Sequence, residues 1–399
     1  MSDSSRPPVP ASGAADTPAG PLSGLRIIEL PALGPAPFAG MVLGGLGADV
    51  IRIERPGAIG PVATAGPYRL LARSHRSVEL DLRDPLAVEA VLRLAATGDG
   101  VIEGWRPGVA ERLGVGPEAC MARHPTLVYG RMTGWGQHGP LSRRAGHDIN
   151  YIALSGVLNA IGRAGGPPVA PLNLVGDFGG GGLMLALGMV AAILEARESG
   201  AGQVIDAAMV DGAALLATTF YGYVAAAQWD PDRGSNLLDS GAPFYDVYET
   251  ADGRWVAVGA LEPQFYAQLL EGLGLAAVEL PEQHDRARWP ELRQRFTAAF
   301  RSRTRDEWEA VFADTDACVT PVLSFEEAPD HPHARARTAF VEVGGVRQPS
   351  PAPGFSRTRC SIGLPPPTPG QHGEPILAEL GFDEADRVQL LTRRGHSGS

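Results

Sequence analysis

The chain contains no lysine, so all 34 of its Lys and Arg residues are arginine. A lysine amine forms the internal Schiff base with pyridoxal phosphate and the Schiff base of the class I aldolases, and it completes the phosphate-binding P-loop. These three kinds of site are therefore excluded. A GC-rich coding sequence is sufficient to explain the arginine bias, and the exclusion holds either way.

Cysteine is scarce as well. Cys120, Cys318 and Cys360 are odd in number and far apart, and they do not have the spacing of metal ligands. This pattern predicts reduced thiols in a cytoplasmic protein, with no metal site.

The features of export, membrane insertion and nucleic-acid binding are missing. Residues 1–20 are rich in Ser, Pro, Ala and Gly and lack the basic start and apolar centre of a signal peptide, so we expect a disordered tail. We expect no apolar run to be long enough to span a bilayer, and hence no membrane contact. The net charge of -11 argues against nucleic acid as a partner.

The remaining composition is that of an ordinary globular protein, with 44% hydrophobic and 20% charged residues, and 399 residues suggest two domains. Strand and helix patterns alternate in the first half, which predicts a Rossmann-like α/β domain with a mostly parallel, doubly wound sheet. A hairpin and several helices follow, as in a smaller α+β domain. We expect strands over 25–30, 49–53, 77–82, 100–104, 127–132, 203–209, 244–249 and 254–259, and helices over 41–46, 85–96, 183–197, 212–228, 263–270, 290–300, 304–312 and 377–393. We assign 1–20 to the tail, 21–228 to the large domain, 229–238 to a linker, 239–323 to the small domain, and 324–399 to a return segment and C-terminal part that pack on the large domain.

A dinucleotide-binding domain is the obvious alternative for the first half, and the sequence disfavours it. The first strand-to-helix turn reads Leu33-Gly34-Pro35-Ala36-Pro37 and lacks the G-x-G-x-x-G pattern that places a pyrophosphate on the helix N-terminus. The glycine run 179–182 opens a predicted helix. We interpret it as allowing close backbone packing rather than as a phosphate cradle.

Arginines are concentrated in the N-terminal part of this acidic chain. Their planar guanidinium groups suit a phosphate-bearing small ligand, and a solvated rim of loop arginines is the alternative interpretation. The residues concerned are Arg52, Arg55, Arg69, Arg73, Arg76, Arg83, Arg106 and Arg112.

Two short motifs place an acid/base residue directly after a glycine. One is Gly146-His147-Asp148-Ile149-Asn150-Tyr151, and the other is Val175-Gly176-Asp177-Phe178-Gly179. We expect each residue to come just before a helix. A histidine and a carboxylate on opposite sides of one carbon can remove a proton from one face and return it to the other, as in a racemase or epimerase. A helix cap without catalysis is the competing interpretation.

Several longer stretches resemble the family III CoA-transferases, and within them the bacterial α-methylacyl-CoA racemases. The resemblance covers about residues 20–357, and its motifs are 20–30 (GPLSGLRIIEL), 46–56 (LGADVIRIERP), 104–109 (GWRPGV) and 131–137 (RMTGWGQ). Gly-His-Asp-Ile-Asn-Tyr is the racemase signature, because the transferases generally lack the histidine. The tail 373–391 looks more like that of the transferases, and 57–71 matches the family poorly.

The resemblance implies a role for each candidate residue. His147 and Asp177 would be the two proton-transferring bases, and Glu262 would orient His147, across an interlocked homodimer with shared active sites. The backbone N–H of Asp148 would donate to the enolate oxygen, while its side chain caps the helix in the competing interpretation. Contacts to CoA are implied for Arg55, Leu80, Asp81, Leu82, Arg83, Gly104, Trp105, Arg106, Arg112, Gly146, Ile149, Asn150 and Tyr151. Trp105 stacks on adenine or packs in the core.

The implied substrate is a 2-methyl-branched acyl-CoA thioester, interconverted between its (R) and (S) forms without a separate cofactor, because CoA is part of the substrate. Two other interpretations stay open. A CoA-transferase would use Asp177 as its nucleophile, and a non-catalytic acyl-CoA-binding protein would leave both motifs without a purpose.

Overall fold

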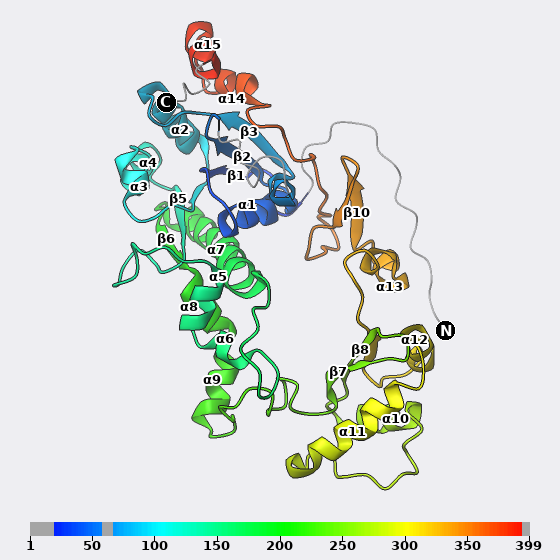
Figure 1. Ribbon diagram of the computed structural model, residues 1–399. Coiled ribbons are helices and arrows are strands. Elements are labelled where there is room, and N and C mark those ends of the chain that lie inside the picture. Colours follow the sequence, from blue (N-terminus) through cyan, green and yellow to red (C-terminus); the bar gives the residue numbers. More distant parts are fainter. Residues whose placement is uncertain (1–19, 58–66, 393–399) are drawn as a thin grey trace. The chain divides into compact units, whose positions relative to one another are not determined.

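The computed structural model describes residues 20–57 and 67–392, and these form two units (Figure 1). Unit one consists of the described residues up to Met132, of Leu185–Ile205 and of the chain from Val341 onward. Unit two consists of Thr133–Met184 and Asp206–Phe340. The predicted tail lies largely outside the described residues, as does most of 57–71. The domain boundaries expected from composition stay a prediction.

Unit one contains most of a six-stranded sheet with the order β3-β2-β1-β4-β5-β6. β1 to β5 are parallel, with Ile28 of β1 opposite Ile51 of β2 and Val101 of β4. The strands are β1 (Arg26–Glu29), β2 (Asp49–Glu54), β3 (His75–Glu79), β4 (Gly100–Glu103), β5 (Val128–Thr133) and β6 (Val204–Ala208). The predicted α/β class with a parallel sheet is confirmed.

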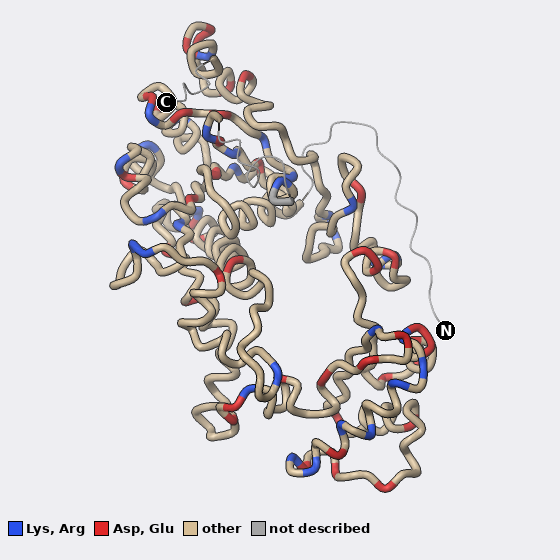
Figure 2. The backbone as a smooth tube through the Cα atoms, in the orientation of Figure 1, with Lys and Arg blue, Asp and Glu red and all other residues tan. Residues whose placement is uncertain are grey.

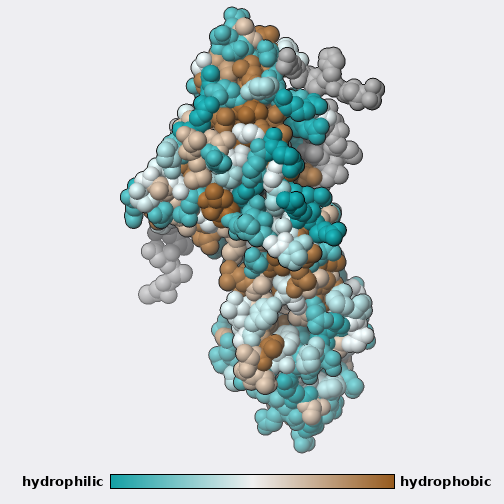
Figure 3. All heavy atoms as spheres, turned by 90° about the vertical axis from the view of Figure 1, so that its left-hand side faces the viewer, coloured by the Kyte–Doolittle hydropathy of each residue, from teal (hydrophilic) through white to brown (hydrophobic). Residues whose placement is uncertain are grey.

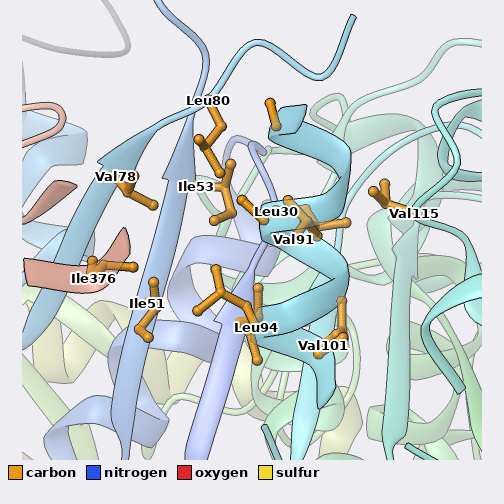
Figure 4. Close-up of a cluster of buried hydrophobic side chains, with 14 of the residues drawn as sticks. Leu30, Ile51, Ile53, Val78, Leu80, Val91, Leu94, Val101, Val115 and Ile376 are labelled. Carbon is orange, nitrogen blue, oxygen red and sulfur yellow. The ribbon is translucent and has the colours of Figure 1, made fainter. Parts of the chain in front are cut away.

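Helices cover both faces of this sheet, as is usual for a parallel sheet whose strands are buried on both sides. Ile28 belongs to the core beneath α2, whereas its neighbour Glu29 lies against Gly40 of α1, since successive side chains of a strand point to opposite faces. The helices of this unit are α1 (Pro35–Gly45), α2 (Pro85–Thr97), α3 (Val109–Arg112), α4 (Pro117–Arg123), α7 (Met184–Ser199), α14 (Gly373–Glu379) and α15 (Glu384–Thr392), with the 3-10 turn η1 (Pro67–Ala72). Figure 4 shows strand side chains such as Leu30 and Ile53 beside Val91 and Leu94 of α2, in one cluster of buried residues.

The single C-terminal helix predicted over 377–393 is wrong. The chain forms α14 and α15 instead, with Gly381 between them at a φ of 74°. A left-handed residue of this kind ends a helix, and glycine adopts it without steric cost. Before α14, β10 (Phe340–Val343) and β11 (Val346–Pro349) form a two-stranded sheet.

Unit two contains a helical part and a small α+β part. The helical part consists of α5 (Asp148–Leu154), α6 (Val157–Ala160), the π-helix η2 (Leu174–Leu183), α8 (Met209–Leu216) and α9 (Thr218–Ala225). The helix predicted over 212–228 is thus two shorter helices that divide at Ala217, where φ is -89° and ψ is 10°.

The α+β part has a three-stranded antiparallel sheet in the order β7-β8-β9. Its strands are β7 (Tyr245–Glu249), β8 (Trp255–Gly259) and β9 (Val319–Pro321), so the predicted hairpin is confirmed. The helices are α10 (Pro263–Gly272), α11 (Trp289–Phe300), α12 (Arg305–Phe312) and α13 (Pro332–Ala336), with the 3-10 turns η3 (Arg286–Arg288) and η4 (Ala328–Asp330). Aromatic side chains dominate its core, as in the stacked pair Tyr248 and Phe300.

One continuous helical stretch, Leu174–Ser199, is long and apolar enough to cross a membrane by length and composition, with a mean hydropathy of 1.7. The expectation that no apolar run reaches this length is therefore wrong. The finding is weak evidence for a membrane span, because core helices pass the same test. Met189 of α7, for example, is fully buried and lies where Gly100 and Gly130 leave room for it beside β4 and β5.

Candidate active site

His147 is the N-cap residue of α5, directly before the helix as predicted. The preceding Gly146 permits a close approach: a Cβ there would lie 2.8 Å from Tyr151 Cε1 and 3.0 Å from the Trp135 ring. The Tyr151 hydroxyl donates a hydrogen bond to the Gly146 carbonyl, and the two rings meet edge to face with centroids 4.7 Å apart. The turn before His147 is therefore held in place by aromatic packing.

Asn150 completes this helix start. Its Oδ1 accepts a hydrogen bond from the His147 backbone N–H at 3.0 Å. The His147 side chain itself is exposed, whereas Asp148, the first helical residue, is buried. The Asp148 N–H is one of the first-turn donors that have no acceptor within their own helix. It is thus available to an oxyanion, as the helix N-terminus is positively polarised.

Asp177 does not precede a helix, as we expected, but lies inside the π-helix η2. The hydrogen bonds of a π-helix join residues five apart, one more than in an α-helix, and such turns occur often at functional sites. The predicted close packing of the glycine run is found here, because Gly180 lies against Gly212 of α8 with no room for a Cβ on either residue. Asp177 is half-buried in this setting.

The side chain of Asp148 joins the two motifs. Its Oδ1 accepts a hydrogen bond from the Asp177 backbone N–H at 2.7 Å. The Asp148 carboxylate can come this close to the backbone of η2 only because residue 176 is a glycine: a Cβ there would lie 2.5 Å from Asp148 Oδ1. Sequence reasoning missed this use of the Asp148 side chain, since the contact spans 29 positions.

Asn173 is a further residue that sequence reasoning missed. Its Nδ2 donates a hydrogen bond to Asp177 Oδ2 at 3.0 Å. The spacing of four residues, which brings side chains together on a helix, is the signal that could have revealed it.

The pKa of Asp177 is raised above its ordinary value. Burial is the largest cause, because it disfavours the charged carboxylate, and the negative charge of Asp148 adds to it. The Asn173 hydrogen bond and the charge of His147 act in the opposite direction. Asp177 is therefore suited to hold a proton as well as to release one.

Glu262, the residue expected to orient His147, is the N-cap of α10 in the small α+β part. Among residues 20–57 and 67–392, no hydrogen bond or ion pair joins it to His147 in the single chain. Its role therefore stays a prediction.

The residues with implied CoA contacts in unit one share an edge of the sheet. Arg55 follows β2, residues 80–83 follow β3, and residues 104–106 follow β4. Because these strands are parallel, their carboxyl ends meet at one edge, which is where α/β sheets bind ligands. Leu80 is buried in the core, and Trp105 is half-buried against the same core, which favours the packing interpretation for this ring.

Several clustered arginines make internal ion pairs and are not free to bind phosphate. Arg52 lies 2.8 Å from Glu29, and Arg76 binds both Asp49 and Glu379. Figure 2 shows the resulting mixture of blue and red segments in the sheet. Arg73 is buried and donates to Gln348 and to the Pro349 carbonyl, and Arg69 donates to the Pro367 carbonyl. Among the arginines with implied CoA contacts, Arg55, Arg83, Arg106 and Arg112 are exposed, and Arg83 is tied to Asp81 at 2.7 Å.

Unit two also contains an apolar cavity of about 640 Å³. Val175, two positions before Asp177, lies in its wall, together with residues of α6 and α9 such as Val157 and Tyr221. In the described part of the chain, no group of three or more His, Cys, Asp or Glu side chains is arranged to hold a metal ion.

Comparison with known proteins decides the family. The chain matches CoA-transferase family III over residues 22–373. It belongs to this family. This chain is 48% identical over 375 residues to the α-methylacyl-CoA racemase of Mus musculus, and the match covers 94% of this chain and 97% of that protein. The racemase of Homo sapiens is 46% identical over 372 residues, with 92% and 96% covered.

A solved structure supports the fold. A CAIB/BAIF family protein from Brucella suis superimposes with a TM-score of 0.78 at 27% identity, covering 91% of this chain and 100% of that one. The predicted membership in family III and the predicted similarity to the racemases are thus confirmed.

Proposed function

We propose that this family III protein is an α-methylacyl-CoA racemase, which interconverts (R)- and (S)-2-methylacyl-CoA. The observation that carries the proposal is the pair of acid/base side chains at the start of α5 and in η2, joined by the bond from Asp177 N–H to Asp148. The similarity to two racemases over more than nine-tenths of the chain supports the same function.

The reaction is a proton transfer at one carbon. The thioester acidifies the α C–H bond, one base takes the proton from one face, and the electron pair delocalises onto the thioester oxygen as an enolate. The conjugate acid on the other face then gives a proton to the α-carbon, and the C–H bond re-forms with inverted configuration. His147 and Asp177 exchange these roles when the direction reverses, and the raised pKa of Asp177 favours its protonated form.

The chain supplies the remaining parts of the site. The Asp148 N–H at the start of α5 would stabilise the enolate oxygen, since a fixed donor there strengthens its bond as charge develops. The carboxyl edge of the unit-one sheet would bind CoA, with Arg106 and Arg112 at its phosphates. The reaction needs no separate cofactor, because CoA arrives with the substrate.

The proposal includes a homodimer in which Glu262 reaches His147 of the other subunit. Apolar side chains are exposed in both units, and a partner would cover them: Leu187 of α7 is 63% exposed, Leu215 of α8 is 60% exposed and Val224 of α9 is 57% exposed. Figure 3 shows brown apolar patches on one face of the molecule. The cytoplasm is the proposed compartment, as all three cysteines are free.

Exchange of the α-proton in D₂O, followed by NMR with (R)- and (S)-2-methylacyl-CoA, tests the function. The wild type should exchange and invert both epimers, and His147→Ala and Asp177→Ala should each lose most racemisation while still folding. Racemisation near the wild-type rate in either variant would exclude the two-base mechanism. Transfer of CoA from a labelled thioester to a free acid, without racemisation, would identify a transferase instead.

A further inference from the structure

The carboxylate of Asp148 is buried in a way that the helix start alone does not explain. The residue is 6% exposed, and its Oδ1 accepts the Asp177 N–H. Its Oδ2 is buried and has no hydrogen-bond partner in the part of the chain that the structure describes. Burying a carboxylate oxygen without a partner is costly, so a group in this state requires a reason.

Helix stabilisation is not a sufficient reason. An acidic residue in the first turn interacts favourably with the helix dipole, but it does so from an exposed position as well. Glu384 in the first turn of α15 is such a residue, and it is exposed. Asp148 therefore has a function that depends on burial and on its contact with the second motif.

We infer that the Asp148 side chain is a positioning residue that fixes the distance between the two proton-transferring groups. α5 carries His147 at its N-cap and presents the Asp148 N–H, while η2 carries Asp177. The bond from the Asp177 N–H to Asp148 Oδ1 connects these two elements directly beside both bases. The inference rests on the proposed racemase function, which requires both bases to reach one carbon atom from opposite faces.

The charge of Asp148 has a second consequence for proton sharing. In the active form the two bases hold one proton between them, on His147 or on Asp177. These two forms contain the same number of protons, so their ratio depends on the difference between the two pKa values and not on pH. The negative charge of Asp148, acting after the larger effect of burial and against the hydrogen bond from Asn173, raises the pKa of Asp177.

Both protonation forms are needed for turnover. The (R) and (S) thioesters are epimers that differ only at the α-carbon and have nearly equal free energy, so the forward and reverse values of kcat/KM must be nearly equal. Each direction of the reaction starts from a different protonation form of the two bases. The less populated of the two forms therefore limits racemisation in both directions. The charged groups facing Asp177 are His147 and Asp148 of α5, while α8, which also packs against η2, contributes only the exposed Asp211.

Replacement of Asp148 by asparagine separates charge from shape. Asn keeps an oxygen that can accept the Asp177 N–H but removes the negative charge. We expect kcat/KM for Asp148→Asn to fall on the order of 10-fold, which corresponds to ~1.4 kcal/mol, with KM changed less than about twofold. The acid limb of its pH–rate profile should move to lower pH, because Asp177 then loses its proton more easily. Asp148→Ala, which also loses the hydrogen bond, should fall on the order of 100-fold.

The control is Glu384→Gln, which removes a first-turn carboxylate from an exposed position in α15 and should leave rate and pH profile unchanged. If Asp148→Asn does not fold, as judged by circular dichroism, Asp148→Ser takes its place with the same expected shift of the acid limb. A neutral variant with lower stability but a wild-type pH profile would reduce Asp148 to a structural role and overturn the inference. A wild type that does not exchange the α-proton would overturn the proposed function and this inference together, whereas active wild type with unchanged Asp148→Asn overturns the inference alone.

Discussion

Gly176→Ala tests the contact between the two motifs without changing a titratable group. A Cβ at this position would lie 2.5 Å from Asp148 Oδ1, 2.9 Å from Asp148 Cγ and 3.2 Å from Ile152 Cγ2. These distances are shorter than normal contacts, so either the Asp148 side chain must shift or α5 and η2 must move apart. Either movement would break the bond from the Asp177 N–H to Asp148 Oδ1.

The expected magnitude follows from these two effects. Overpacking a buried position costs about 1–3 kcal/mol. A hydrogen bond to a charged group is worth about 1.5–3 kcal/mol. The overpacking and the lost hydrogen bond result from the same displacement, so their costs do not add fully. We expect a loss of roughly 3 kcal/mol in the free energy of unfolding. Racemisation should fall on the order of 100-fold, because displacement of a catalytic group by about 1 Å has effects of this size.

The assays are urea unfolding followed by circular dichroism and racemisation followed by NMR in D₂O. Gly188→Ala is the matched control, since this residue lies in α7 and its added Cβ would meet only Ile205 at 3.5 Å, an ordinary contact. Alanine should stabilise that helix by about 0.5–1 kcal/mol. A Gly176→Ala protein with wild-type stability and activity would refute the tight contact between Gly176 and Asp148.

Three further predictions follow from the other parts of the molecule. Glu29 lies 2.8 Å from Arg52 and 3.1 Å from His75. Burial alone would raise its pKa, but these two groups outweigh burial and the pKa is lowered. The contribution of Glu29 to stability is therefore present above the ordinary pKa of 4.5 and is lost as pH falls through the lower pKa of the folded state. Glu29→Gln should lower the free energy of unfolding at pH 7 by about 3 kcal/mol and flatten its decrease in acid, and a variant that matches the wild type in urea melts at pH 7 and pH 4 would contradict this assignment. Hydroxylamine trapping and intact mass should find no acyl or CoA adduct on Asp177 during turnover, whereas a stoichiometric adduct that passes to a new CoA ester would indicate a transferase. A heterodimer of His147→Ala and Glu262→Ala chains, isolated with two tags, should recover about half of the wild-type activity if Glu262 acts across the dimer, because one site then carries both defects and the other carries none. The test requires that Glu262→Ala itself be strongly impaired. Activity no higher than that of the better homodimeric variant would refute the trans arrangement.

The local sequence was sufficient for most of the fold of unit one. Runs of branched apolar residues separated by amphipathic helices define βαβ units, and such units form parallel sheets with helices on both faces. The start of α5 was also predictable, since Gly146 and Asn150 are local signals that specify where the helix begins and how His147 is held. The carboxyl edge of the sheet follows from strand order, and it brings Arg55, Leu82 and Arg106 to one side.

Several features depended on contacts between distant residues. The division at Ala217 and the separation of α14 from α15 were missed, because periodicity continues across a short interruption. The arginine cluster looked like a phosphate site in the sequence, but Arg52 and Arg76 have partners that are remote in the chain, such as Glu29 and Glu379. Ion pairs of this kind form only when strands and the C-terminal helices come together.

The sequence by itself indicated which residues are candidates for proton transfer, because His147 and Asp177 each follow a glycine in a short motif and have side chains that can exchange a proton. Only the tertiary structure decided that Asp177 lies in a π-helix packed against Gly212 and that Asp148 contacts its backbone. The physical reason is that burial and close backbone approach, which raise the pKa of Asp177, arise from segments that meet only in the folded chain.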